Sequence, residues 1–195
     1  MQLCFASNNV HKLDEIRALL PAGLTLLSLA DIGCAEELPE TQDTLEGNAR
    51  QKAEYVHQHY GVACFADDTG LEVDALNGEP GVYSARYAGP QRRAEDNVAK
   101  LLQELAGKPD RSARFRTVIA LAGADGSMRE FAGEVAGHIT EQPRGNGGFG
   151  YDPVFVPTEG DGRTFAEMSA EEKNQISHRA RAMAGLLEFL KEDKE

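Results

Sequence analysis

One segment in the first half of the chain restricts the fold more than any other. Residues 62–66 (VACFA) form an apolar run typical of a buried strand, and Asp67, Asp68, Thr69 and Gly70 follow it directly. Two adjacent ionised acids repel each other and lose hydration there, so solvent, hydrogen-bond donors or a cation must compensate them. The segment therefore predicts a central strand that delivers carboxylates to a site, with a divalent metal as one compensator. The alternative is an ordinary strand exit with Asp67 and Asp68 as solvated turn residues.

Composition limits the partners and the compartment. The 195 residues suit one domain spanning 1–195, and the net charge of −12 argues against a broad surface for nucleic acid or anionic lipid. The three cysteines are widely spaced and lack a C-x-x-C pair, so neither a disulfide framework nor a zinc site is indicated. No signal-peptide pattern opens the chain, and no apolar run approaches the roughly 20 residues of a membrane span. We expect a cytoplasmic protein without membrane contact.

The N-terminal segment predicts strand, turn and helix. Residues 3–6 are apolar, and the leucines and isoleucine at 13, 16, 19 and 20 have helical spacing. The turn between them, Ser7 to Lys12, places hydroxyl, amide and amine groups at a helix start, where free N–H groups and the helix dipole favour an anion such as phosphate. Plain N-capping by Ser7 or Asn8 is the alternative. No glycine cradle precedes Lys12, so this is not a Walker A loop.

The next part predicts a strand over 24–29, an acidic irregular connection over 31–42 and a long helix. Asp43 and Glu46 have the spacing of a capping box. The apolar face of that helix consists of Leu45, Ala49, Ala53, Val56 and Tyr60. Lys52 lies off this stripe, free to point toward a cleft.

Later segments complete a mixed α/β pattern. A short strand is expected over 71–74, a fixed Gly/Pro loop over 78–83, and a helix over 98–105. Strand-like segments over 115–122 and 128–139 meet at Asp125-Gly126, a good hairpin signal. The last helix is predicted to begin near Ser169, with Glu172 three residues later.

Two further stretches have functional potential. Residues 145–153 combine four glycines with Phe149 and Tyr151, which would let a nucleobase stack against a ring; a glycine-rich hairpin loop is the alternative. Lys173, His178 and Arg179 stand on the predicted polar side of the last helix, where a solvated charged face would explain them equally well.

Taken together, these motifs resemble one family. Residues 7–12, 38–40, 48–53, 67–70, 84–87, 149–152 and 177–179 occur in the order and approximate spacing of the inosine triphosphate pyrophosphatases. The resemblance covers the chain from first strand to last helix. It implies an elongated mixed β-sheet with flanking helices in two lobes, a nucleotide cleft between them, a Mg²⁺ requirement and a homodimer.

The resemblance also implies residue roles. It makes Asp68 the catalytic proton acceptor and places Glu40 and Asp68 at magnesium. It assigns to the triphosphate end Ser7, Asn8, Asn9, Val10, His11, Lys12, Lys52 and Thr69, the last standing where many members have serine. It assigns to base, ribose and remaining nucleotide contacts Phe149, Gly150, Tyr151, Asp152, Lys173, His178 and Arg179.

The implied reaction is hydrolysis of ITP, dITP and XTP to the nucleoside monophosphate and diphosphate. Magnesium with Lys12, Lys52 and Lys173 could neutralise a triphosphate in an otherwise acidic protein. Three alternatives stay open: a septum-formation-type nucleotide pyrophosphatase with other substrates, a non-catalytic nucleotide sensor, and a structural α/β domain.

Overall fold

The computed structural model describes residues 1–192 and has the mixed α/β architecture expected from the sequence. Its six-stranded sheet has the order β2-β1-β3-β4-β5-β6. The strands are β1 Gln2–Phe5, β2 Thr25–Leu27, β3 Cys64–Val73, β4 Ser112–Ala122, β5 Met128–Ile139 and β6 Phe155–Pro157. Strand β1 runs parallel to β2 and β3, whereas β5 and β6 are antiparallel, so the sheet is mixed.

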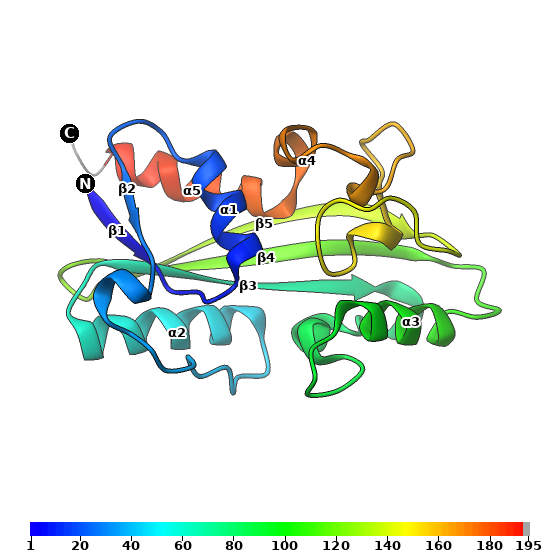
Figure 1. The fold of residues 1–195 in the computed structure, drawn as a ribbon, viewed down its shortest axis with the longest axis horizontal. Helices are drawn as coiled ribbons and strands as arrows, with labels where there is room; N and C mark the ends of the chain where they lie inside the picture. Colours follow the sequence, from blue (N-terminus) through cyan, green and yellow to red (C-terminus); the bar gives the residue numbers. More distant parts are fainter. Residues whose placement is uncertain (193–195) are drawn as a thin grey trace. The chain divides into compact units, whose positions relative to one another are not determined.

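Among the described residues, five α-helices accompany the sheet (Figure 1). They are α1 Val10–Leu19, α2 Leu45–Tyr60, α3 Ala94–Glu104, α4 Ala170–Ile176 and α5 His178–Glu192. Short 3₁₀ segments lie between these elements, among them η3 Gly81–Arg86. No helix within residues 1–192 has both the length and the apolar character that a bilayer crossing demands.

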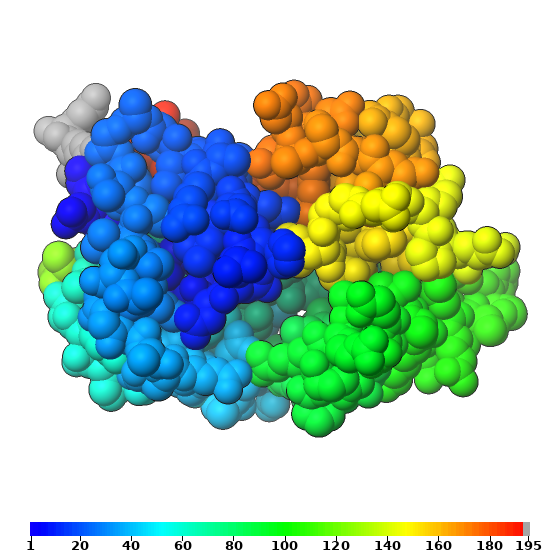
Figure 2. Space-filling view, in the orientation of Figure 1, coloured from blue at the N-terminus to red at the C-terminus, as the bar shows by residue number. Residues whose placement is uncertain are grey.

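The chain divides into two compact units. Unit 1 contains Met1–Asp68, Thr117–Gly133 and the segment from Arg179 onward, and unit 2 contains Thr69–Arg116 and Glu134–His178. Strands β3, β4 and β5 contribute residues to both. In the space-filling view, the N-terminal segments in blue cover much of the visible face of unit 1, and the segments in green, yellow and orange cover that of unit 2 (Figure 2).

In unit 1, helices α1 and α5 pack on one face of the sheet, and α2 lies on the other (Figure 1). Stacked rings of Phe5 and Phe65, with centroids 4.9 Å apart, join β1 to β3 in the core under α1 and α5. On the α2 side, Ala49, Ala53 and Val56 are fully buried. This agrees with the apolar stripe read from the sequence.

Unit 2 has its own core around the remaining parts of β3, β4 and β5. Helix α3 contributes Val98 and Leu101 to it, and Phe115 of β4 meets Phe155 edge to face at 4.7 Å. The exposed glycine-rich segment 145–148 leads from this core to another 3₁₀ segment, η4 Asp152–Val154. Each unit therefore has a separate apolar cluster.

The central strand is longer than predicted. It does not end at Asp67 and Asp68, because β3 continues through Gly70 to Val73. The backbone of η3 approaches it there: a Cβ added at Gly70 would lie 2.6 Å from the carbonyl oxygen of Gly81. The Leu71 N–H also donates to Ser84 Oγ of η3 at 2.9 Å. Glycine permits this close packing at position 70. The two acids therefore lie within β3 and not at its end.

Several helix ends also differ from the prediction. The expected single C-terminal helix is two helices, α4 and α5, because Ser177 adopts an extended ψ of 152° between them. Asn9 caps α1 in place of Ser7 or Asn8, and Thr44 caps α2 in place of Asp43. The Ser169–Glu172 capping box and the turn between β4 and β5 are confirmed. Side-chain hydrogen bonds decide the capping position, and those depend on where the chain turns.

Candidate active site

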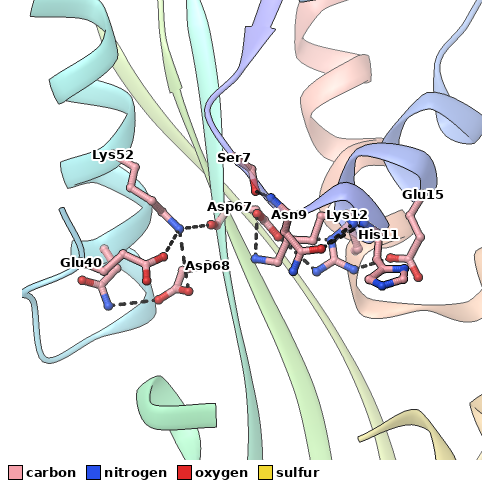
Figure 3. Close-up of polar contacts among 11 residues, drawn as sticks. Ser7, Asn9, His11, Lys12, Glu15, Glu40, Lys52, Asp67 and Asp68 are labelled. Carbon is pink, nitrogen blue, oxygen red and sulfur yellow. Dashed lines mark hydrogen bonds and ion pairs between the residues drawn. The ribbon is translucent and has the colours of Figure 1, made fainter. Parts of the chain in front are cut away.

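The two adjacent acids of β3, Asp67 and Asp68, contact two different groups of side chains (Figure 3). Successive side chains of a strand point to opposite faces of its sheet. Asp67 is fully buried and bonds to Lys12 of α1, whereas Asp68 bonds to Asn48 of α2. The paired acids are thus neither solvated turn residues nor a shared carboxylate pair, and each has its own partners within unit 1.

Asp67 connects three elements. Its Oδ1 accepts from Lys12 Nζ at 3.0 Å, and its Oδ2 accepts from Arg179 Nε and Nη2 of α5, both at 3.2 Å. The remaining terminal nitrogen of Arg179, Nη1, donates to Glu15 of α1. Lys12 and Glu15 are three residues apart on one helix, so the network fixes α1 to both β3 and α5.

Burial and charge act against each other on these groups. Burial alone would raise the pKa of Asp67, but Lys12, Arg179 and Lys52 outweigh it and hold that pKa well below its usual range. Burial lowers the pKa of Lys12, although Asp67 opposes this. Burial also disfavours the charged form of Arg179, yet Asp67 and Glu15 raise its pKa. The geometry therefore keeps Asp67 ionised and paired.

Asp68 belongs to a second group with Glu40, Asn48 and Lys52. Lys52 Nζ donates to Glu40 Oε1 at 2.7 Å and to the Asp67 carbonyl oxygen at 2.6 Å, and it lies 4.0 Å from Asp68 Oδ1. Asn48 Nδ2 donates to Asp68 Oδ2 at 3.1 Å. Lys52 is 5 % exposed, so it is buried among carboxylates.

The electrostatics of this group favour a proton acceptor. Burial raises the pKa of Asp68; Lys52 and Lys12 oppose that rise, while Glu40 and Asp67 add to it. Burial would lower the pKa of Lys52, but the neighbouring carboxylates of Asp68, Glu40 and Asp67 raise it overall. A carboxylate with a raised pKa beside a firmly charged ammonium binds a proton more readily than an ordinary aspartate.

The Ser7–Lys12 turn lies at the surface of unit 1, where Asn8, Asn9, Val10 and His11 are exposed. Asn9 Oδ1 accepts from the N–H groups of His11 and Lys12 at 3.0 and 3.2 Å, and Ser7 Oγ accepts from Asn9 N–H at 3.2 Å. The two hydrogen bonds to Asn9 Oδ1 show that the N–H groups of His11 and Lys12 point toward the N-terminal end of α1. An anion at this end of α1 would meet the same positive end of the helix dipole.

Two carboxylates of unit 1, those of Glu40 and Asp68, are the candidate ligands for a metal ion. No cluster of three or more His, Cys, Asp or Glu side chains suited to a metal exists in the described part of the chain. Mg²⁺, however, is commonly held by one or two carboxylates together with substrate phosphates and water. Counting Lys12, Lys52 and Arg179 against Glu15, Glu40, Asp67 and Asp68, the combined groups carry one excess negative charge. The donor set therefore fits a hard divalent cation.

Unit 2 holds most of the residues assigned from the sequence to the base. Lys173 Nζ donates to Asp152 Oδ2 at 2.6 Å, and the same oxygen accepts from Phe149 N–H at 2.9 Å. The Lys173 ammonium lies 4.8 Å from the centre of the Phe149 ring. This arrangement places a buried cation, a carboxylate and a half-buried aromatic ring together.

The other residues of this set have diverse surroundings. Tyr151 is buried, and its hydroxyl donates to the Ser84 carbonyl oxygen at 2.7 Å. His178 stacks on Phe115 with ring centroids 4.6 Å apart. Gly150 has a φ of 61°. Thr69, assigned from the sequence to the triphosphate end, is half-buried on β3. The hydroxyl of Tyr151 therefore serves the fold, while its ring remains part of the aromatic cluster.

Comparison with known proteins decides the family. A profile described as Ham1 family matches residues 3–189 of this chain. This chain belongs to the Ham1 family. A dITP/XTP pyrophosphatase of Flavobacterium johnsoniae is 56% identical to it, covering 97% of this chain and 98% of that protein. One of Porphyromonas gingivalis is 57% identical, covering 97% of each. The solved structure of the Staphylococcus aureus Ham1 protein matches with a TM-score of 0.90 and 39% identity, covering 99% of this chain and 100% of that one.

Family membership confirms the resemblance drawn from the motifs, but the contacts of this Ham1-family chain add residues with no role assigned from sequence. Asp67, Glu15 and Asn48 each bond to a predicted site residue. A signal for Asn48 was available, because it precedes Lys52 by four residues and so shares its helix face. Nothing in the sequence distinguishes Glu15 from the other charges of α1.

Proposed function

We propose that this protein hydrolyses noncanonical purine nucleoside triphosphates, namely ITP, dITP and XTP, to the nucleoside monophosphate and diphosphate. The observation that carries the proposal is the Asp68 carboxylate, held by Asn48 and facing Lys52 and Glu40 in a family whose relatives are named dITP/XTP pyrophosphatases. Residues 1–195 act as one functional domain, which the sequence predicts to be cytoplasmic and homodimeric.

The reaction requires a base, local positive charge and an oriented triphosphate. Asp68 accepts a proton from the water that attacks the α-phosphorus; the bond from that phosphorus to the bridging oxygen breaks, and diphosphate leaves. Its raised pKa suits this role. No side chain becomes phosphorylated.

Cationic groups on helices α1 and α2 of unit 1 bind the triphosphate. The Ser7–Lys12 turn offers the N-terminus of α1, and Lys12 and Lys52 supply ammonium groups. Both ammonium groups form ion pairs with carboxylates in the structure. A bound phosphate would therefore interact with each ammonium group together with its carboxylate partner. Thr69 contributes its hydroxyl, as the sequence predicts.

Glu40 and Asp68 would hold Mg²⁺. When bound, the ion would neutralise charge on the triphosphate and its leaving group. Glu40 is half-buried and fixed by Lys52, so its carboxylate is already directed toward that of Asp68 through the shared ammonium (Figure 3).

The base is recognised by the residues of unit 2. Phe149 offers a ring face, with Gly150 and Tyr151 beside it in the chain, and Lys173 and His178 offer donors to a 6-oxo group. Adenine presents an amino donor at that position, and a buried donor-to-donor mismatch can reject it by a factor of about 10⁴. Asp152 orients Lys173 for this contact.

Arg179 acts indirectly in this proposal. Its guanidinium is 1 % exposed and bonds to Asp67 and Glu15. We therefore propose that Arg179 affects nucleotide binding by way of Lys12, because both side chains donate to the Asp67 carboxylate. A direct bond to the base would require these carboxylate contacts to break.

Diphosphate release tests the proposal. The purified protein is incubated with ITP, XTP, dITP, dGTP, TTP and ATP in the presence of Mg²⁺. We expect efficient release from the first three and little from ATP. Preferential release from TTP would favour a septum-formation-type enzyme, and tight nucleotide binding without release would favour a sensor.

Asp68→Asn tests the assigned base. It preserves size and the contact with Asn48 but removes the proton acceptor, so kcat should fall by at least roughly a hundredfold, within the range of general-base catalysis. Circular dichroism and thermal melting confirm that the variant folds. Near wild-type turnover in a folded variant would exclude Asp68 as the base.

A further inference from the structure

Asn48 of helix α2 is almost completely buried, at 1 % exposure, although its side chain is polar. Both ends of its amide group are bonded: Oδ1 accepts from Gln42 N–H at 2.9 Å, and Nδ2 donates to Asp68 Oδ2 at 3.1 Å. We propose that Asn48 is a positioning residue that couples the loop carrying Glu40 to the Asp68 carboxylate.

The chemistry of the two partners fixes the orientation of this amide. A backbone N–H can only donate, and an ionised carboxylate can only accept. Exchanging the oxygen and nitrogen of Asn48 would set a donor against the Gln42 N–H and an acceptor against Asp68. The amide therefore has one orientation, and among the standard side chains of its size only asparagine supplies both groups.

The loop itself needs such support. Residues 37–42 have no helix or strand of their own, and Glu40 lies among them. Helix α2 bonds to three successive loop residues: Lys52 Nζ to Glu40, Gln51 Oε1 to Thr41 N–H at 2.9 Å, and Asn48 Oδ1 to Gln42 N–H. One helix face, with positions 48, 51 and 52, thus acts as a template for an irregular segment.

Asn48 differs from the other two because it alone joins the loop's backbone to Asp68. Asn48 Nδ2 donates to Asp68 Oδ2, while the other carboxylate oxygen, Asp68 Oδ1, lies 4.0 Å from Lys52 Nζ. The two oxygens of the carboxylate are thereby distinguished, and the base cannot rotate freely about its Cβ–Cγ bond. Movement of the Glu40 loop would be transmitted to the base, and movement of the base to the loop.

This role rests on the proposed function, but one of its tests does not. Backbone amide exchange, followed by NMR in the absence of nucleotide and metal, reports the Gln42 hydrogen bond directly. Asn48→Ala should speed exchange at Gln42 by roughly tenfold or more. Asp68→Ala should also speed it, because Asn48 loses its second anchor, and the double variant should exchange no faster than Asn48→Ala alone.

Two matched variants separate the contacts. Gln51→Ala removes the tether at Thr41 and leaves the Asn48 amide in place, so exchange should rise at Thr41 and stay slow at Gln42. Gln58→Ala removes an exposed amide from the same helix and should change neither. Equal effects of Asn48→Ala at Gln42 and at amides throughout α2 would show a general loss of stability and would overturn the proposal.

Asn48→Asp provides the decisive kinetic variant. It retains size and an acceptor for Gln42 N–H, but it replaces the donor to Asp68 with a second carboxylate. Because the acceptor for Gln42 N–H is kept and only the bond to Asp68 is lost, exchange at Gln42 should rise less than in Asn48→Ala, while kcat falls by roughly tenfold or more, the effect of losing one charge-assisted hydrogen bond. Wild-type kcat in this variant would overturn the positioning role.

The two proposals fail in different ways. If the wild-type protein releases diphosphate from no nucleotide, the proposed function fails, and the exchange cycle between Asn48 and Asp68 still decides the coupling. If the wild-type protein is active and Asp68→Ala leaves exchange at Gln42 unchanged, the coupling fails while the function stands.

Discussion

Arg179→Met is expected to destabilise the protein strongly, because it removes a buried charge from between two carboxylates. The guanidinium is 1 % exposed and bonds to Asp67, which is fully buried, and to Glu15, whose side chain is 13 % exposed. Methionine retains much of the volume, so the change removes chiefly the ion pairs. Asp67 would keep its ion pair with Lys12, at 3.0 Å.

The magnitude follows from burial. Removing one partner of a buried ion pair typically costs about 3–5 kcal/mol, since the other charge is left without compensation. Lys12 remains bonded to Asp67, which argues for the lower end, about 3 kcal/mol. For a chain of this size, 1 kcal/mol changes Tm by about 2–4 °C, so Tm should fall by roughly 6–12 °C.

Arg17→Met is the matched control. Arg17 also forms an ion pair, with Asp14 at 3.5 Å, but the two side chains are 57 % and 74 % exposed. Exposed pairs contribute about 0–1 kcal/mol, so this variant should melt within about 4 °C of the wild type. Both variants are compared by thermal melting at neutral pH and low salt.

The pH dependence supplies a second test. The folded-state pKa of Asp67 is lowered, so its ionised form contributes stability above the unfolded pKa of about 3.9, and this stability is lost as pH falls toward the folded pKa. Without Arg179 the folded pKa rises. The Tm difference between wild type and Arg179→Met should therefore have its full size near pH 7 and decrease below about pH 4. A difference that is constant from pH 7 to pH 3, or no larger than that of Arg17→Met, would refute the reasoning.

Two further predictions concern the metal and the base. Glu40→Gln should weaken Mg²⁺ binding, because an amide oxygen is a poorer ligand than a carboxylate; Mn²⁺ titration by electron paramagnetic resonance and the Mg²⁺ dependence of rate check this, and unchanged curves would return Glu40 to a structural role. Tyr151→Phe removes the hydroxyl that donates to the Ser84 carbonyl and should cost about 1–2 kcal/mol in the free energy of unfolding while leaving KM for ITP nearly unchanged. Denaturant melts and steady-state kinetics measure both, and a large rise in KM without loss of stability would place that hydroxyl on the nucleotide.

The sequence by itself determined most of the elements and the family. Local patterns sufficed for this, because strand alternation, helical spacing and glycine-containing turns depend on neighbouring residues. The apolar stripe of α2, the turn between β4 and β5, and the Ser169 capping box all followed from such patterns. The motifs together also identified the family, since their order along the chain is a property of sequence alone.

Tertiary structure decided which charges meet. Asp67 and Asp68 are neighbours in sequence, yet one bonds to Lys12 and Arg179 and the other to Asn48, because a strand directs successive side chains to opposite faces. Asp67 and Arg179 are separated by 112 residues, so local patterns cannot pair them. The continuation of β3 past its acids to Val73, where the Gly81 backbone lies close to Gly70, was likewise visible only in the structure. Sequence thus supplied the charged groups, and only the packing of separate segments determined their pairing and burial.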